Sequence, residues 1–185
     1  MSSESFAEIG RIGAIEKLFA GIEGKRKKDI SFVHRVMLEG IDFDLSYFPL
    51  KHLGYKAVVE VTGELYSRLC EAQNLSVILG VSSKLDYRQI EEFWSGVRVA
   101  AEEFGYSGLN LDLVPSLNGL SISLGATGTQ PSALFCKAQS KDVICVSGAL
   151  GSAFLGQQVL ENRSAELEKY KMMVADYLKP ELREH

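Results

Sequence analysis

The chain has 185 residues, of which 46% are hydrophobic and 24% are charged. These are the proportions of an ordinary folded domain and not of a disordered chain. A net charge of −4 excludes the global positive field that attracts nucleic acids or anionic membranes. The sequence has neither a run of roughly 18 apolar residues, which a membrane span needs, nor an initial segment with the plan of a signal peptide. Its three cysteines lack metal-binding spacing, and their odd number suits a reducing compartment. We therefore expect a cytoplasmic domain that contacts neither nucleic acid nor membrane.

Hydrophobic periodicity divides the first half of the chain into helices and strands. Apolar residues at spacings near 3.6 indicate the helices, and short runs rich in Leu, Val and Ile indicate the strands. Pro49 suits the first turn of a helix, where its missing N–H would have no partner in any case. The predicted elements are a helix over residues 5–20, a polar segment over 21–29, a strand over 30–38 that ends at the turn Glu39-Gly40, a helix from Pro49 to about Glu71, and a strand over 74–82.

The second half continues the same mixture. Asp86 and Gln89 have the spacing of a capping box, and Gly105 has the place of the glycine that follows a helix C-terminus. The predicted elements are a helix between Asp86 and Gly105, strands over 108–114 and 120–127, an irregular stretch over 130–140, a strand over 142–147, a turn over 148–151, a helix to about Glu161, and a helix over 165–178 that Pro180 ends. Strands mixed with amphipathic helices predict a single domain of class α+β or α/β.

Carboxylates near strand ends and turns are the first candidates for chemistry. They are Glu39, Asp42, Asp44, Glu60, Glu64 and Asp112. Asp112 interrupts an apolar strand, so either one face of that strand is solvated or the carboxylate binds a cation such as Mg²⁺.

Two segments are candidate anion sites. The basic run Lys25–Lys28 forms either a solvated loop or a phosphate-binding loop, for which Gly24 alone is weak support. The turn that contains Gly148 and Gly151 either connects a strand to a helix or presents N–H groups at a helix N-terminus to an anion. The sequence contains no nucleophile elbow, Walker loop, zinc spacing or dinucleotide fingerprint, so no catalytic residue is assigned.

Residues 37–47 and 49–57, which begin Met37-Leu38-Glu39-Gly40, closely resemble the thiamine-monophosphate kinases, a family similar to the N-terminal domain of aminoimidazole ribonucleotide (AIR) synthase. Further agreement lies in residues 75–81, 90–96, 119–123 and 144–151. The resemblance implies an α+β fold like that N-terminal domain, with a mixed sheet flanked by helices and used for homodimerisation. It implies one domain over residues 1–178 and a tail over 179–185, where the family's second domain would begin.

The kinases hold ATP and Mg²⁺ with clustered aspartates, and this sequence keeps few of the matching residues. Glu64 and Asp112 retain carboxylates and are the implied metal ligands, and Gly148 and Gly151 are the implied cofactor-binding residues. The departures are the shortened run at residues 24–29 in place of Gly-Asp-Asp-Ala, Val33, His34 and Arg35 in place of Thr-Thr-Asp, Phe135 in place of an arginine, and Ala149 in place of an aspartate.

These departures favour a stand-alone, degenerate kinase-like domain that binds no cofactor and acts as a homodimeric structural, regulatory or ligand-binding protein, with room for a further protein partner. The alternative is an active kinase that uses ATP and Mg²⁺, held by Glu64 and Asp112, to convert thiamine monophosphate to thiamine diphosphate. A third hypothesis is a binding module for an anionic ligand, attracted by Lys25–Lys28 and Arg35.

Overall fold

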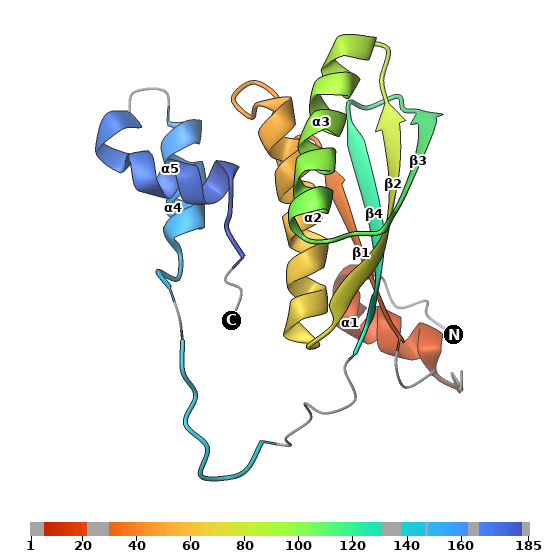
Figure 1. Cartoon of the computed structure of the whole chain (residues 1–185), viewed down its shortest axis with the longest axis vertical. Helices are drawn as coiled ribbons and strands as arrows, with labels where there is room; N and C mark the ends of the chain where they lie inside the picture. Colours follow the sequence, from red (N-terminus) through yellow and green to blue (C-terminus); the bar gives the residue numbers. More distant parts are fainter. Residues whose placement is uncertain (1–5, 22–29, 131–137, 147, 163–166, 183–185) are drawn as a thin grey trace.

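The computed structural model describes residues 6–21, 30–130, 138–146, 148–162 and 167–182 (Figure 1). Within these ranges the helices and strands are, in chain order, α1 (Phe6–Phe19), β1 (Ile30–Leu38), α2 (Leu50–Ser67), β2 (Glu71–Val81), α3 (Tyr87–Glu103), β3 (Gly108–Pro115), β4 (Ser121–Thr129), α4 (Ser152–Glu161), the short 3-10 helix η1 (Leu167–Tyr170) and α5 (Lys171–Leu178).

The four strands form one mixed sheet in the order β1-β4-β2-β3. β4 runs antiparallel to both of its neighbours, β1 and β2. β3 lies at the far edge and is parallel to β2, with α3 as the crossover connection that a parallel pair needs. The expected α+β class, a mixed sheet flanked by helices, is confirmed.

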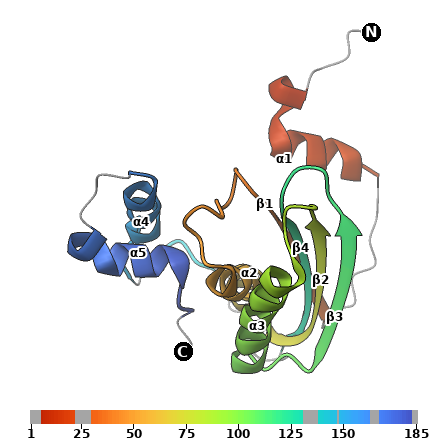
Figure 2. The ribbon, with the colours of Figure 1, turned by 90° about the horizontal axis from the view of Figure 1, so that it is seen from above.

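α2 and α3 cover one face of this sheet, as the view from above shows (Figure 2). Alternate residues of each strand point to the two helices, so Val33 and Met37 of β1 and Ile122 and Leu124 of β4 are buried in the core. The opposite face is open. Six large apolar side chains on it remain more than a third exposed: Ile30, Phe32, Val36, Leu38, Ile78 and Val114.

Two glycines allow α2 and α3 to pack closely. A Cβ atom on Gly54 of α2 would lie 2.1 Å from the carbonyl oxygen of Phe93, and a Cβ atom on Gly96 of α3 would lie 1.9 Å from that of Lys51. Both distances are far below a normal contact, so each backbone occupies the space that a side chain would fill. This close contact holds α2 against the sheet and fixes the positions of its polar residues.

Several local predictions are confirmed. β1 spans residues 30–38 as expected. The capping box of α3 is complete, because Asp86 Oδ1 accepts from the Gln89 N–H at 2.9 Å and Gln89 Oε1 accepts from the Asp86 N–H at 3.0 Å. Gly105 follows the helix with a φ of +71°, the left-handed conformation expected at that position.

The predicted end of the second helix was wrong. α2 stops at Ser67, and Glu71 is already the first residue of β2. Leu69 adopts a φ of +55°, which no residue inside a right-handed helix can have, and its N–H bonds back to the Tyr66 carbonyl. The apolar spacing that continues through Leu69 therefore belongs to a turn. α1 is also interrupted, at Gly10, where φ is +69° and ψ is 165°.

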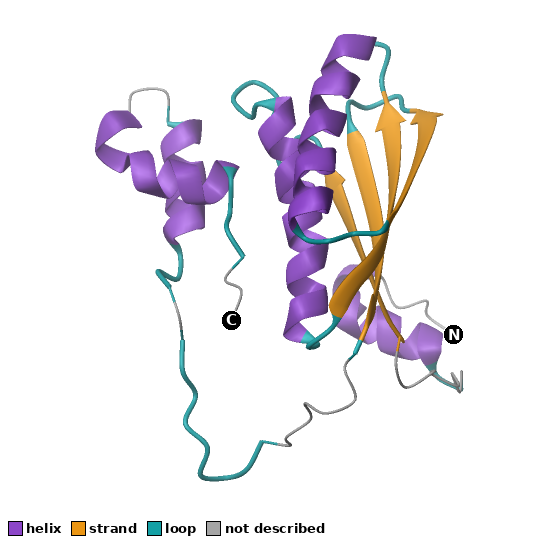
Figure 3. Ribbon diagram, in the orientation of Figure 1, coloured by secondary structure: helices purple, strands orange, loops and turns teal. Residues whose placement is uncertain are grey.

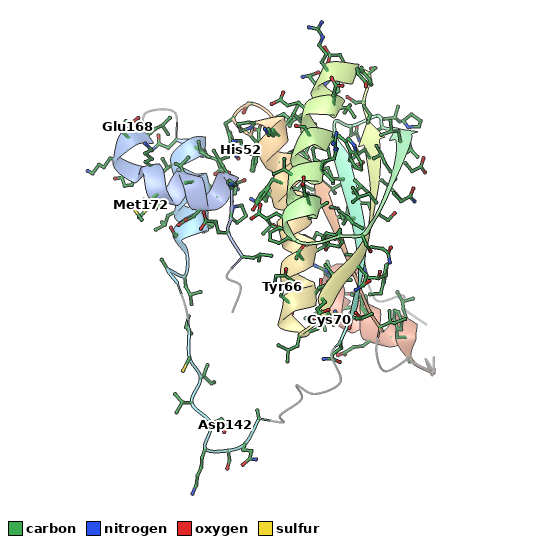
Figure 4. The ribbon with its side chains drawn as sticks, viewed as in Figure 1. His52, Tyr66, Cys70, Asp142, Glu168 and Met172 are labelled. Carbon is green, nitrogen blue, oxygen red and sulfur yellow. The ribbon has the colours of Figure 1, made fainter. Side chains whose placement is uncertain are left out.

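Two predictions for the C-terminal part were wrong. Residues 142–146 are extended but pair with no strand in the part of the chain that the structure describes (Figure 3). Figure 4 shows Asp142 in this segment, away from the sheet. The last helix is not continuous from residue 165, since Tyr170 leaves helical geometry (φ −114°, ψ 19°) between η1 and α5. Lys25–Lys28, Phe135 and Ser147 lie outside the described residues.

None of the helices over the described residues is long and apolar enough to cross a membrane.

Candidate functional site

Polar side chains from β1, the loop after it and α2 meet at one end of the helix layer. The ladder pairs Arg35 with Leu124, which is buried under the helices, so Arg35 also points to the helix side of the sheet. Its Nη2 atom lies 3.6 Å from Asp42 Oδ1, and its Nε atom lies 3.2 Å from Glu60 Oε2. The three side chains, 26–40% exposed, form a partly buried group that we call the Arg35 cluster.

The loop between β1 and α2 is built to hold Asp42 in this place. Asp42 Oδ2 accepts a hydrogen bond from the Leu38 N–H at 2.8 Å, so one carboxylate oxygen closes the turn while the other faces Arg35. Gly40 adopts a φ of +80° and donates to the Phe43 carbonyl at 2.8 Å. Glu39 Oε2 accepts from the Leu120 N–H at 2.7 Å and joins the loop to the start of β4.

Lys56 lies beside the Arg35 cluster and is only 8% exposed. Its Nζ atom is 3.8 Å from the ring centroid of Tyr177 in α5 and 5.2 Å from that of Phe48. Burial lowers the pKa of Lys56, an effect that the negative charges of Glu60 and Asp42 oppose and the positive charge of Arg35 reinforces. The positive charges of Lys56 and Arg35 therefore equal in number the negative charges of Glu60 and Asp42 in this region.

The two predicted metal ligands are not brought together within one chain. Glu64 lies in α2, on the helix side of the sheet, and binds Arg68 at 2.5 Å, while Arg68 Nη1 donates to the Phe32 carbonyl in β1. Asp112 lies in β3, at the opposite edge, and its ladder partner Ile78 belongs to the open face. The sheet itself separates the two carboxylates. Across residues 6–21, 30–130, 138–146, 148–162 and 167–182, no three acidic, histidine or cysteine side chains converge as a metal site would require.

The two predicted cofactor-binding glycines form the turn before α4. Gly148 and Gly151 have φ values of +89° and +86°, and Gly151 is the N-cap residue of α4. Both residues are exposed. The turn is present as expected from the sequence, and its role in anion binding stays a prediction.

Tyr55 links α2 to α3 and gives this region a pH dependence. Its hydroxyl donates to Glu103 Oε1 at 2.9 Å, and burial together with this hydrogen bond raises the pKa of Tyr55 to about 12. Tyrosines of the unfolded chain ionise near pH 10, so the stability that Tyr55 contributes is fully present below about pH 10 and is lost as the pH rises towards about 12.

The free energy of unfolding of the wild type should fall as the pH rises from about 9 to about 11.5. We expect this fall to be less steep in Tyr55→Phe, by at most about 1.4 kcal/mol per pH unit. Urea titrations at each pH measure this. Tyr87→Phe, at a position 77% exposed, is the control and should keep the wild-type slope. An unchanged slope in Tyr55→Phe would contradict the assignment.

No protein-family model and no curated protein matches this chain. A thiamine monophosphate kinase from Aquifex aeolicus aligns over 92% of this chain, with a TM-score of 0.76 and 23% identity. AaThiL complexed with AMPPCP and TMP aligns over 97%, with a TM-score of 0.81 and 21% identity. This chain has the thiamine-monophosphate-kinase fold.

A third structure of this fold, the thiamine-monophosphate kinase from Stenotrophomonas maltophilia, aligns over 85% of the chain with a TM-score of 0.73 and 20% identity. The resemblance seen in the sequence is thus confirmed at the level of the fold. The chain spans only 61%, 62% and 52% of the lengths of these three kinase structures.

Sequence reasoning named Asp42 and Glu60 among many carboxylates but did not pair them with Arg35. The strand alternation around Arg35 was the available signal, because Val33 and Met37, two residues away on each side, are core residues of the same face. The contact between Lys56 and Tyr177 was missed entirely. It joins residues more than a hundred positions apart, and no local sequence pattern predicts it.

Proposed function

We propose that this chain is a thiamine-monophosphate-kinase-like domain that transfers no phosphoryl group and acts as a homodimeric structural, regulatory or ligand-binding protein. The Arg35 cluster is the observation that carries this proposal. Phosphoryl transfer relies on metal ions held by carboxylates, and those ions neutralise the developing phosphate charge. Here the Arg35 guanidinium lies between Asp42 and Glu60, 3.6 Å from the Asp42 oxygen and 3.2 Å from the Glu60 oxygen. These residues do not fit a metal clamp, so we derive no transfer step through one.

The proposal predicts that ATP, with or without Mg²⁺, leaves the melting temperature unchanged at millimolar concentration. A ligand that binds only the folded state must raise stability, by about 2.7 kcal/mol at one hundred times its Kd. Differential scanning fluorimetry measures the shift, and an assay for phosphorylation of thiamine monophosphate should yield no product.

A Mg²⁺-dependent shift would instead support the alternative, an active kinase. In that function Asp112 and Glu64 would be metal ligands, and Gly148 and Gly151 would contact the nucleotide. Asp112→Asn should then abolish the shift. A shift accompanied by product formation would contradict the proposed lack of catalysis.

An anionic ligand is less well supported than it was from the sequence alone. Asp42 and Glu60 neutralise the positive charge that Arg35 was expected to give to the cleft. Lys25–Lys28 remain as candidate anion ligands and lie outside the described residues.

The open face of the sheet supports the homodimer. Phe32 and Val36 of β1 are 61% and 51% exposed, and Ile78 of β2 is 42% exposed on the same face. The ladder partners between them on β4 are the small residues Ser123 and Thr127. An open sheet face with large exposed apolar side chains of this kind is the type that a second sheet covers. We propose that a second copy of the chain covers it.

Phe32→Glu tests the dimer, because a buried and unpaired carboxylate opposes association. We expect light scattering at micromolar concentration to give twice the chain mass of 20.4 kDa for the wild type and the single mass for the variant. Tyr87→Glu, an equally drastic change at an exposed position of α3, should leave the dimer intact. A monomeric wild type would contradict the proposal.

We also propose a cytoplasmic location. The thiols of Cys70 and Cys145 are both free, the first buried and the second exposed, as suits a reducing compartment.

A further inference from the structure

α4 and α5 form a compact unit that is attached to the rest of the molecule by few contacts. A Cβ atom on Gly156 would lie 1.9 Å from the Met173 carbonyl oxygen, so the two helices touch backbone to backbone, and Ser152 Oγ donates to Asp176. Residues 138–146, which precede this unit, contain no helix or strand (Figure 1). We call residues 152–162 and 167–182 the strap.

The strap contacts α2 through a small set of side chains. Tyr177 is its most buried member, with 5% exposure, and its ring lies 5.4 Å from that of Phe48. Lys179 Nζ lies 5.0 Å from the Tyr55 ring, and Leu182 reaches Gly63 of α2. The Lys56 ammonium occupies the centre of this contact, 3.8 Å from the Tyr177 ring.

The aromatic rings compete with two carboxylates for Lys56. Glu60 and Asp42 both act electrostatically on the Lys56 ammonium, and both are engaged by Arg35. If Arg35 lost its charge, these carboxylates would lose their counter-ion, and the Lys56 ammonium, on which both already act, would be a cation available to them. An ammonium–carboxylate pair in a partly buried place is stronger than the contact with an aromatic face.

We propose that the strap can detach from α2. The Lys56 ammonium, which contacts the Phe48 and Tyr177 rings, acts as the latch that holds the strap on α2. Arg35 keeps this latch closed because its ion pairs with Asp42 and Glu60 prevent these carboxylates from attracting Lys56. Any event that draws Arg35 away from the two carboxylates then releases the strap from α2. The proposal is independent of whether the chain binds a nucleotide.

Hydrogen exchange measured by mass spectrometry on the full chain tests this proposal. α5 has eight residues, too few for a stable helix on its own, so the protection of its amides depends on its packing against both α4 and α2, and loss of the α2 contact should lower it. We expect Arg35→Met to accelerate exchange in α5 about ten- to thirtyfold, the factor that corresponds to losing a desolvated cation–π contact, and to leave β2 and β4 unchanged. Arg35→Lys, which keeps the charge, should restore most of the protection, and Arg98→Met on the exposed side of α3 is the control.

The second arm uses Lys56→Met, which retains the packing of the side chain and removes the ammonium. We expect α5 to exchange faster in this variant, and Arg35→Met combined with it to add nothing further. If Arg35→Met also accelerates exchange in the sheet, the triple variant Arg35→Met, Asp42→Asn, Glu60→Gln distinguishes the latch from a general loss of stability. This variant removes the competing carboxylates and should return α5 to wild-type protection. Wild-type exchange of α5 in Arg35→Met, full additivity with Lys56→Met, or failure of the triple variant to recover protection would each overturn the proposal.

Discussion

Gly96→Ala is expected to destabilise the domain by about 3 kcal/mol or more, the upper range for overpacking a core. The added Cβ atom would lie 1.9 Å from the Lys51 carbonyl oxygen and 3.0 Å from the Tyr55 backbone nitrogen, so α2 and α3 must separate to admit it. The atoms that the new Cβ would meet belong to the backbone of α2, so no change of side-chain rotamer can relieve the clash. Separation would also draw Leu53 away from Phe93, two fully buried residues of the core. Urea unfolding followed by circular dichroism measures the loss.

Gly63→Ala is the matched control, since Gly63 is likewise a glycine inside a long helix, in this case α2. Its Cβ atom would meet only the end of the Leu182 side chain, at 3.2 Å, which can turn away. Alanine is favoured over glycine inside a helix by about 1 kcal/mol, so this variant should be neutral or slightly stabilised. Equal destabilisation by the two substitutions would show that helix approach is not the cause.

Much of the fold is encoded in local patterns that the sequence displays. Residues 30–38 form β1 because the segment is rich in β-branched and other apolar side chains. Asp86 and Gln89 cap α3 because their side chains need only each other's backbone, three residues away. The errors arose where a pattern needed a distant partner. Residues 142–146 have the composition of a strand, but a strand forms only beside another strand, and none is adjacent in the described structure.

The candidate site was harder to predict because its chemistry depends on which side chains contact one another. Arg35 in a strand suggested added positive charge, whereas the ladder turns its side chain towards Asp42 and Glu60, which neutralise it. Asp112 and Glu64 suggested a shared metal, whereas strand order places them at opposite edges and on opposite faces. The sequence could therefore name candidate residues, and which of them lie together became visible only with the sheet order and register.

Arg35→Glu is expected to create a divalent-cation site. The Oε atom of glutamate has the same place along the side chain as the Nε atom of arginine, which lies 3.2 Å from Glu60 Oε2. Oxygens about 3 Å apart suit a shared cation with bonds of roughly 2.1–2.5 Å, and Asp42 supplies a third carboxylate. Without metal, three like charges should destabilise the fold by about 1–3 kcal/mol. Added Mn²⁺ or Mg²⁺ should restore stability, by about 2.7 kcal/mol at one hundred times the Kd.

Arg68→Glu provides the comparison for this prediction, because Arg68 is paired with the single carboxylate Glu64. It places only two carboxylates together, so its melting temperature should respond much less to the same cations, and the wild type should not respond at all. Scanning fluorimetry with and without EDTA separates the three proteins. If Arg35→Glu gains no stability from millimolar Mn²⁺, the arginine is not what distinguishes this cluster from a metal site, and the proposed lack of a metal clamp would have to rest on other positions of the chain.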